Sequence, residues 1–338
     1  MLKTILLTGA TGYIGSHTWI ELLDAGYDVV GVDNFINSSP IVLDRIKKIT
    51  GKTPVFIEAD MVDYNVINQV FNRHQVSAAI HFAALKSVNE SVSPPLKYYA
   101  NNLNSLLTLC QCMNEANVKK LVFSSSAAIY GNPATVPIRE NFPLSATNPY
   151  GQTKLMGEQV LRDLENADAN WKVAYLRYFN PVGAHQSGLI GEDPGGIPNN
   201  LMPYIARVAV KQSEKVAVFG SDYPTPDGTG IRDYIQVVDL AKAHLAALNY
   251  LEQQQQSLTV NIGTGRGYSV LEVIAAYKKA SNQSIPYQLV PRRPGDVACC
   301  YADPGRAATL LDWRAMHDLE KICADSWRWQ SQNPHGFK

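Results

Sequence analysis

The sequence predicts an α/β protein in which a doubly wound parallel sheet forms a first domain, residues 1–180, and a smaller α/β domain follows in residues 181–338. Short apolar strands alternate with helical segments through the first half of the chain, the order that builds a parallel sheet with helices on both faces. Gly, Pro and Asn become frequent after Asn180. We therefore place the boundary near that residue, although later segments can pack back on the first domain.

Composition and charge exclude several classes of partner. The 338 residues are 46% hydrophobic and 18% charged, and 30 basic residues balance 30 acidic ones. This balance gives no electrostatic reason to expect nucleic acid or an anionic membrane as the partner. The 5 cysteines show no Cys-x-x-Cys spacing, so we expect reduced thiols and no bound metal. The sequence has no signal-peptide pattern and no run of about 18 apolar residues, which predicts a cytoplasmic protein.

The N-terminal segment has the pattern of a nucleotide-binding unit. A strand at Thr4–Thr8 leads into a turn, a helical pattern follows from Ser16 to Ala25, and a second strand runs from Tyr27 to Asp33. The turn contains Gly9, Gly12 and Gly15. Glycines let the backbone approach a pyrophosphate that faces the helix N-terminus, and an acid after the second strand can bind the adenosine ribose. This unit predicts a Rossmann-type fold that binds NAD rather than NADP. The alternative is a glycine-rich turn without a ligand.

The next two predicted strands also end near this site. Pro54–Glu58 leads to Asp60, which could bond the adenine amino group or cap a helix, and the two roles are compatible. Ala78–Phe82 is followed by small residues and by Lys86, which could reach the phosphates or ribose of a dinucleotide. His81 lies within an apolar strand, which favours a hydrogen-bonded core histidine over a catalytic base.

A serine run follows the fifth predicted strand. The helix from Leu96 to Asn117 precedes the strand Lys120–Phe123, and the strand leads directly into Ser124, Ser125 and Ser126. Ligands of open α/β sheets lie beyond the carboxyl ends of the strands, so we expect Ser126 at a reaction centre. The alternative is that the serines only solvate a turn.

Tyr150 and Lys154 are one helical turn apart and can share one helix face. Pro149 starts this helix, which we expect to reach Leu164, and a strand follows at Trp171–Arg177. A free phenol has a pKa near ~10, and a nearby positive charge favours the phenolate. Such a tyrosine can exchange a proton with an alcohol. On its own the pair could equally mark an ordinary surface turn, because it often arises by chance.

Taken together, these motifs resemble the extended short-chain dehydrogenase/reductase superfamily, and within it the UDP-galactose (UDP-glucose) 4-epimerase family. The resemblance covers nearly the whole chain and rests on the segments Thr8–His17, His81–Lys86, Ser124–Ser126, Arg177–Ala184, Ile197–Tyr204, Gly228–Tyr234 and Arg292–Asp296. It implies an NAD-dependent isomerase that inverts C4 of UDP-hexoses through a 4-keto sugar. It also implies roles in galactose metabolism and in supplying sugar donors for surface polysaccharide, and a homodimer formed through a helix pair of the first domain.

The resemblance assigns roles to matching residues. It implies Tyr150 as the base, Lys154 as the residue that lowers its pKa and binds the nicotinamide ribose, and Ser126 as a partner of the reacting hydroxyl. The implied NAD site comprises Gly9, Gly12, Tyr13, Ile14, Gly15, Asp33, Asn34, Asn37, Ser38, Asp60, Met61, Phe82, Ala83, Ala84, Lys86, Asn101, Ser124, Tyr150, Lys154 and Tyr178. The implied UDP-sugar site comprises Lys86, Ser126, Tyr150, Phe179, Asn180, Asn200, Leu201, Ala217, Phe219, Arg232, Tyr234, Arg293, Asp296 and Cys300.

Two of these assignments also have support from chemistry. Arg232 and Arg293 could neutralise the diphosphate through bidentate bonds, or they could be exposed solubilising charges. At the position of Cys300 the family has either a bulky tyrosine or a cysteine, and the cysteine implies room for a 2-acetamido group and activity on UDP-GlcNAc and UDP-GalNAc. Cys300 could instead be filler, or form a redox pair with Cys299, although adjacent cysteines make strained disulfides.

Two other functions remain open. A nucleotide-sugar 4,6-dehydratase or decarboxylase has the same fold, but a dehydratase commonly has an Asp-Glu pair after its catalytic Ser or Thr, whereas Ala127 and Ala128 follow Ser126 here. A non-catalytic NAD-binding regulator should have lost Ser126, Tyr150 or Lys154, and all three are present.

Overall fold

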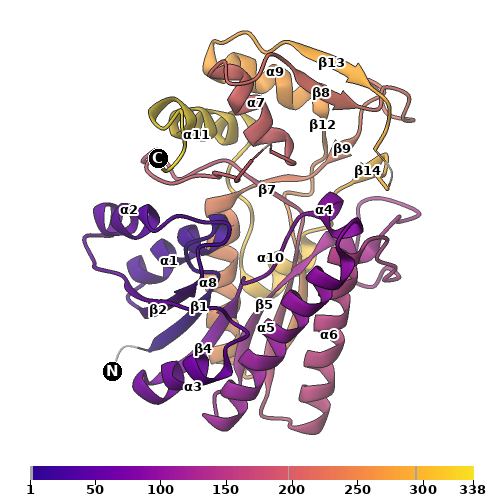
Figure 1. The fold of residues 1–338 in the computed structure, drawn as a ribbon. Coiled ribbons are helices and arrows are strands. Elements are labelled where there is room, and N and C mark those ends of the chain that lie inside the picture. The colour runs from indigo at the N-terminus through magenta and orange to yellow at the C-terminus, as the bar shows by residue number, and fades with distance from the viewer. Residues whose placement is uncertain (1–2, 197, 294) are drawn as a thin grey trace.

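A computed structural model gives the structure of the protein and describes residues 3–196, 198–293 and 295–338. Ile197 and Pro294, which belong to two of the motifs above, lie outside the described residues. Figure 1 shows a larger lower body built on a sheet and a smaller upper body, which is formed mainly by the C-terminal third of the chain.

The lower body is organised around a parallel sheet, which has seven strands within the described residues. Their order across the sheet is β11-β6-β5-β4-β1-β2-β3. The bounds are β1 Thr4–Thr8, β2 Asp28–Asp33, β3 Val55–Glu58, β4 Val76–His81, β5 Lys120–Ser126, β6 Lys172–Tyr178 and β11 Leu258–Ile262. The strand order reverses between β1 and β4, and ligands of doubly wound sheets bind at such a point. The predicted Rossmann-type sheet is confirmed.

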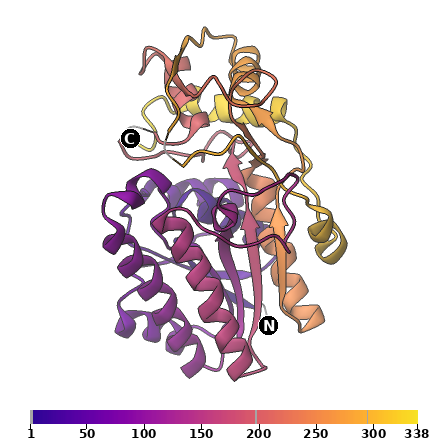
Figure 2. The ribbon, with the colours of Figure 1, turned by 90° about the vertical axis from the view of Figure 1, so that its right-hand side faces the viewer.

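Helices cover both faces of the sheet (Figure 2). One face carries α1 Tyr13–Asp24, α2 Ile41–Thr50, α8 Val237–Gln254 and α10 Gly305–Leu311, and the other carries α3 Tyr64–Arg73, α5 Pro95–Glu115 and α6 Pro149–Ala167. Each layer has its own buried core: Trp19, Ile20 and Leu248 lie in the first, and Leu109 and Leu161 in the second. In the described part of the chain, no helix is long and apolar enough to cross a membrane.

Two of the element boundaries that differ from the sequence prediction lie at the site. Helix α1 begins at Tyr13 rather than Ser16, so Gly15 lies in its first turn. A Cβ on Gly15 would stand 2.2 Å from the carbonyl oxygen of Gly9, so this glycine lets the helix pack on the turn before it. Strand β5 continues through Ser126 instead of ending at Phe123, because the serines keep pairing with β6.

The upper body is a set of short strands and three helices, as far as the structure describes it. Its strands are β7 Asn180–Val182, β8 Val216–Phe219, β9 Ile231–Arg232, β10 Tyr234–Gln236, β12 Tyr268–Ser269, β13 Tyr287–Val290 and β14 Cys299–Cys300. Its helices are α7 Leu201–Ala209, α9 Val270–Ser281 and α11 Leu319–Gln332. Val216, Ile205, Ile274 and Ile322 belong to the separate hydrophobic core that these elements share.

Segments after residue 180 return to the lower body. Strand β11 pairs with β6 at the edge of the main sheet, α8 packs against α1, and α10 lies beside both α8 and β11. Two short elements, α4 Val88–Val92 and the 3-10 helix Ala127–Tyr130, follow strands β4 and β5. The division into domains at residue 180 remains a prediction, with these returning segments as its exceptions.

Candidate active site

A large cavity of about 1070 Å³ lies over the carboxyl ends of the sheet strands and reaches into the upper body. All of the residues predicted above for catalysis, for the dinucleotide and for the UDP-sugar line it. They come from both bodies, because the turns after β1 and β4 supply one wall together with β2, β5 and α6, and α7, β8, β9 and β14 supply the other. Sequence reasoning missed Glu192, Asn199 and Tyr223, which also line the cavity. No periodic pattern marks these residues.

The N-terminal turn of α1 provides a place for phosphate groups. Gly12 caps this helix without a side-chain hydrogen bond, so the first backbone N–H groups remain available to an anion. Gly9 has a φ of +65°, and a Cβ there would stand 2.8 Å from the backbone nitrogen of Ala83. The turns after β1 and β4 therefore touch directly. This geometry fits a pyrophosphate.

Asp33 is held in place at the end of β2. Its carboxylate accepts hydrogen bonds from the backbone nitrogen of Thr11 at 3.1 Å and from that of Phe35 at 3.0 Å. A fixed carboxylate next to the glycine turn fits the hydroxyl groups of a ribose. Asp60 lies nearby and accepts a bond from Asn34 at 3.2 Å. The suggestion that Asp60 caps a helix is wrong, because Asp63 caps α3.

The other end of the cavity brings Ser126, Tyr150 and Lys154 together. Asn148 caps α6 by accepting from the backbone nitrogen of Gly151 at 2.8 Å, which places Tyr150 in the first turn. The Ser126 hydroxyl accepts from the backbone nitrogen of Ala128 at 3.1 Å, so its own hydrogen is left to donate. Burial raises the pKa of Tyr150, and the hydrogen bond with Ser126, which stabilises a phenolate, offsets part of this rise.

Lys154 is buried beside Ser124. Its ammonium donates to the carbonyl oxygen of Ser124 at 2.7 Å, and burial lowers its pKa to about 7. Burial raises the pKa of Tyr150, which Ser126 lowers only in part. The lowering of the pKa of Tyr150 by Lys154 therefore stays a prediction.

The lowered pKa of Lys154 predicts a pH-dependent stability. Unfolding returns this pKa from about 7 towards ~10.4, so between these values the unfolded chain binds more protons. The free energy of unfolding should therefore rise with pH in this range, by at most about 1.4 kcal/mol per pH unit from this group. Chemical denaturation from pH 7.5 to 9.5 should show wild type gaining stability relative to Lys154→Met. A constant difference between the two proteins would contradict the prediction.

His81 has the properties of a core histidine. It is 2% exposed, and its Nδ1 is 2.8 Å from the hydroxyl of Thr8. Burial, with the charge of Lys154 adding to it, lowers its pKa to about 3. A neutral ring that is already hydrogen-bonded is poorly suited to act as a base at neutral pH.

The upper wall is cationic and aromatic. Arg232 lies 3.8 Å from Asp296, and the guanidinium of Arg293 stacks 3.7 Å from the ring centre of Phe219. Arg292 is used differently, since it stacks on Tyr223 at 4.1 Å. Cys300 is half-buried in β14 beside Arg232, and burial raises the pKa of its thiol to about 11. Among residues 3–196, 198–293 and 295–338, no cluster of His, Cys, Asp or Glu could hold a metal ion.

Comparison with known proteins agrees with this geometry. The NAD dependent epimerase/dehydratase family matches residues 5–263. The UDP-glucose 4-epimerase of Bacillus subtilis (strain 168) is 58% identical over 334 residues, which cover 99% of this chain and 98% of the relative. A UDP-glucose 4-epimerase from Bifidobacterium longum, solved in complex with NAD+ and UDP, has a TM-score of 0.96 and 52% identity, covering 99% of this chain and 100% of that one.

A further solved structure is relevant to the sugar. The UDP-Glc/GlcNAc 4-epimerase of Campylobacter jejuni is 39% identical with a TM-score of 0.85, and the match covers 98% of this chain and 99% of that one. Sequence identity over full length, the shared fold and the NAD-bound structural neighbour lead to one conclusion. The chain belongs to the UDP-glucose 4-epimerase family of NAD-dependent enzymes.

Proposed function

We propose that this chain interconverts UDP-galactose and UDP-glucose by removing and returning hydrogen at C4 of the sugar. The observation that carries the proposal is the meeting of Ser126, Tyr150 and Lys154 in one cavity with a glycine turn suited to a dinucleotide. A purified sample given either UDP-sugar should reach the same mixture of both. Absorbance near 340 nm should show little net NADH, because the reaction has no net oxidation.

Tyr150 and Ser126 handle the proton in this proposal. Tyr150 takes the proton of the C4 hydroxyl, and Ser126 donates a hydrogen bond to the reacting oxygen. NAD supplies the complementary chemistry, since it can accept a hydride from C4 and give it back. Lys154 orients the cofactor ribose and adds positive charge near Tyr150. When the flat 4-keto sugar turns its other face to the same groups, the returning hydrogens invert C4.

The nucleotide end must remain bound while the sugar turns. Arg232 and Arg293 lie on the upper wall, where two guanidinium groups can bind a diphosphate. Asn180 and Asn200 also line the cavity and can bond the sugar or its phosphates. The hexose, by contrast, needs contacts loose enough to let it rotate.

The alternative functions fit the cavity less well. Ala127 and Ala128, which follow Ser126, line the cavity and provide neither an acid nor a base for a 4,6-dehydratase. A non-catalytic regulator has no need for the buried ammonium of Lys154, which carries a desolvation cost.

We also propose activity on UDP-GlcNAc and UDP-GalNAc, on the basis of Cys300. A cysteine side chain at this wall is smaller than a tyrosine and leaves room for a 2-acetamido group. The similar enzyme from Campylobacter jejuni, which is described as acting on both UDP-Glc and UDP-GlcNAc, makes this substrate range reasonable within the fold. The test is an assay of the purified protein with all four UDP-hexoses.

Replacing Cys300 with Tyr should separate the two activities. The larger ring should lower kcat/KM for UDP-GalNAc by at least about a hundredfold, a steric loss of roughly 3 kcal/mol, and change that for UDP-galactose by less than about threefold. Cys300→Ser is the matched control, because it preserves the space and should preserve both activities. Equal losses of kcat/KM on both substrates would contradict the proposal that residue 300 leaves room for the 2-acetamido group.

Three further features remain predictions. The exposed side chains of Leu107 on α5 and Met156 on α6 are consistent with a homodimer through this helix pair, for which the molar mass in solution is the measurement. The cytoplasmic location expected from the sequence, and the roles in galactose metabolism and surface polysaccharide supply that the resemblance implies, need tests in the cell of origin.

A further inference from the structure

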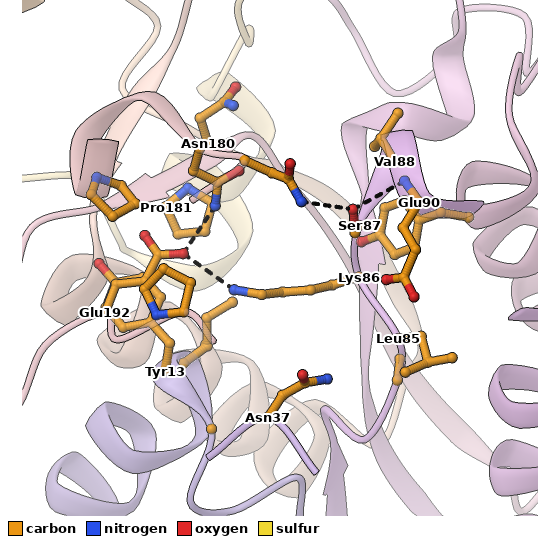
Figure 3. Close-up of a pocket in the computed structure, with 18 of the residues that line it drawn as sticks. Tyr13, Asn37, Leu85, Lys86, Ser87, Val88, Glu90, Asn180, Pro181 and Glu192 are labelled. Carbon is orange, nitrogen blue, oxygen red and sulfur yellow. Dashed lines mark hydrogen bonds and ion pairs between the residues drawn. The ribbon is translucent and has the colours of Figure 1, made fainter. Parts of the chain in front are cut away.

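Glu192 bridges the cavity between its two walls. Its carboxylate oxygen Oε1 lies 3.3 Å from Nζ of Lys86 and accepts a hydrogen bond from Nδ2 of Asn200 at 2.9 Å. Lys86 follows β4 in the lower body, whereas Asn200 caps α7 in the upper body. Figure 3 shows the long side chain of Lys86 reaching across the pocket to Glu192. A bond of 3.3 Å from Asn199 to Ser87 joins the same two segments a second time.

The two ends of this bridge differ in how deeply they are buried. The Glu192 side chain is 8% exposed, whereas that of Lys86 is 55% exposed. The Glu192 backbone is also held, because its carbonyl accepts from the indole nitrogen of Trp329 at 3.3 Å. A Cβ on the preceding Gly191 would stand 2.4 Å from the same indole ring. When the ion pair breaks, Lys86 therefore moves and Glu192 remains in the cavity wall.

A diphosphate that enters the cavity competes with Glu192 for the same cation. We propose that Glu192 is a positioning residue that holds Lys86 across the cavity, gives it up to a bound diphosphate, and thereby limits how tightly that diphosphate is held. This inference rests on the proposed function, because it takes UDP or the dinucleotide as the source of the diphosphate. It adds a residue that the sequence motifs do not assign.

The limit on affinity follows from electrostatics. Once Lys86 has turned to the diphosphate, the buried carboxylate has lost its cation and lies near new negative charge. A carboxylate in this position costs free energy through desolvation and repulsion. Glu192 therefore opposes binding, although it is hydrogen-bonded to Asn200. An enzyme that must release its product after each turnover gains from such a limit.

Glu192→Gln tests the proposal on the NAD-containing enzyme. Glutamine keeps the size of the side chain and an oxygen for Asn200 but removes the charge. Calorimetric titration with UDP should show binding about fivefold tighter than in wild type. Glu90→Gln is the matched control, since Glu90 lines the same cavity but pairs with Lys97 and Tyr98. It should change the affinity by less than about twofold.

The sign of the change separates an electrostatic role from a purely structural one. A residue that only supports the fold would weaken UDP binding and lower Tm when replaced. A second measurement follows the loss of NAD from the enzyme during dialysis. Slower loss from Glu192→Gln than from wild type would show that Lys86 binds the diphosphate of the dinucleotide rather than that of UDP. Unchanged or weaker retention of both ligands would overturn the inference. Wild-type enzyme that fails to bind UDP at all would instead overturn the proposed function.

Discussion

Tyr150→Phe should reduce kcat for the interconversion of UDP-galactose and UDP-glucose by about a thousandfold. The substitution removes one buried hydroxyl and keeps the ring, so the packing of α6 on β5 should survive. Without this hydroxyl, no group next to Ser126 can take the proton of the C4 hydroxyl. Lys154 cannot replace Tyr150, because its ammonium already donates to the carbonyl of Ser124. The loss should therefore appear in kcat, with the affinity for UDP within about threefold of wild type.

The measurement is turnover at saturating substrate, with calorimetric UDP affinity and Tm recorded on the same samples. Tyr98→Phe is a suitable control, because Tyr98 also lines the cavity but donates its hydroxyl to Glu90 at 2.8 Å. It should keep kcat within about twofold. A Tyr150→Phe enzyme that works at the wild-type rate would end the proposed mechanism, whereas one that no longer binds UDP would indicate a structural defect.

The parts of the fold that depend on short stretches of sequence could be predicted. The strand, glycine turn, helix and acidic strand end between Thr4 and Asp33 are local features, since periodicity and glycine placement determine them within a few residues. The pairing of β11 with β6 could not be predicted, because the two strands are far apart in the chain. Strands β7 to β10 and helices α7 and α8 lie between them. No local pattern in Leu258–Ile262 predicts which strand it pairs with.

At the active site too, features that depend on distant segments could not be predicted from the sequence. The residues near Tyr150 were predicted from motif and resemblance, but the rise that burial causes in the pKa of Tyr150 was not, because burial depends on how distant segments pack around α6. The extension of β5 to Ser126 places the carbonyl of Ser124 within reach of Lys154, a contact that no local sequence pattern predicts. Glu192 shows no sequence signal either, since its role needs Lys86 and Asn200 in three dimensions.

The relation between β5 and α6 depends on a buried ion pair, Arg177–Glu158. Arg177 donates from Nε to Oε1 at 2.9 Å and from Nη2 to Oε2 at 2.6 Å, and Ser125 donates to Oε1 at 2.6 Å. Burial tends to lower the pKa of Arg177, but the bonds and charge of Glu158 outweigh it and raise that pKa. The pair thus joins β5, β6 and α6 immediately behind Ser126 and Lys154.

Glu158→Gln should destabilise the protein by about 3–5 kcal/mol, because it leaves the buried guanidinium of Arg177 without its counter-charge. For a chain of this length, that loss lowers Tm by roughly 5 °C. Where the variant still folds at the assay temperature, kcat should fall more than UDP affinity. The reason is that β5 and α6 carry the reacting groups, whereas the upper wall carries the predicted nucleotide contacts.

Arg162→Ala provides the matched control for this prediction. Arg162 contacts the same carboxylate, at 3.4 Å from Oε2, but its side chain is 42% exposed, so its loss should cost no more than about 0.5 kcal/mol. Replacing both partners, as Glu158→Leu with Arg177→Met, should cost less than the sum of the single changes, since no buried charge is left alone. If Glu158→Gln had the same Tm as Arg162→Ala, the ion pair would not be what fixes α6 against β5. Apolar packing alone would then have to set the spacing of Tyr150 from Ser126.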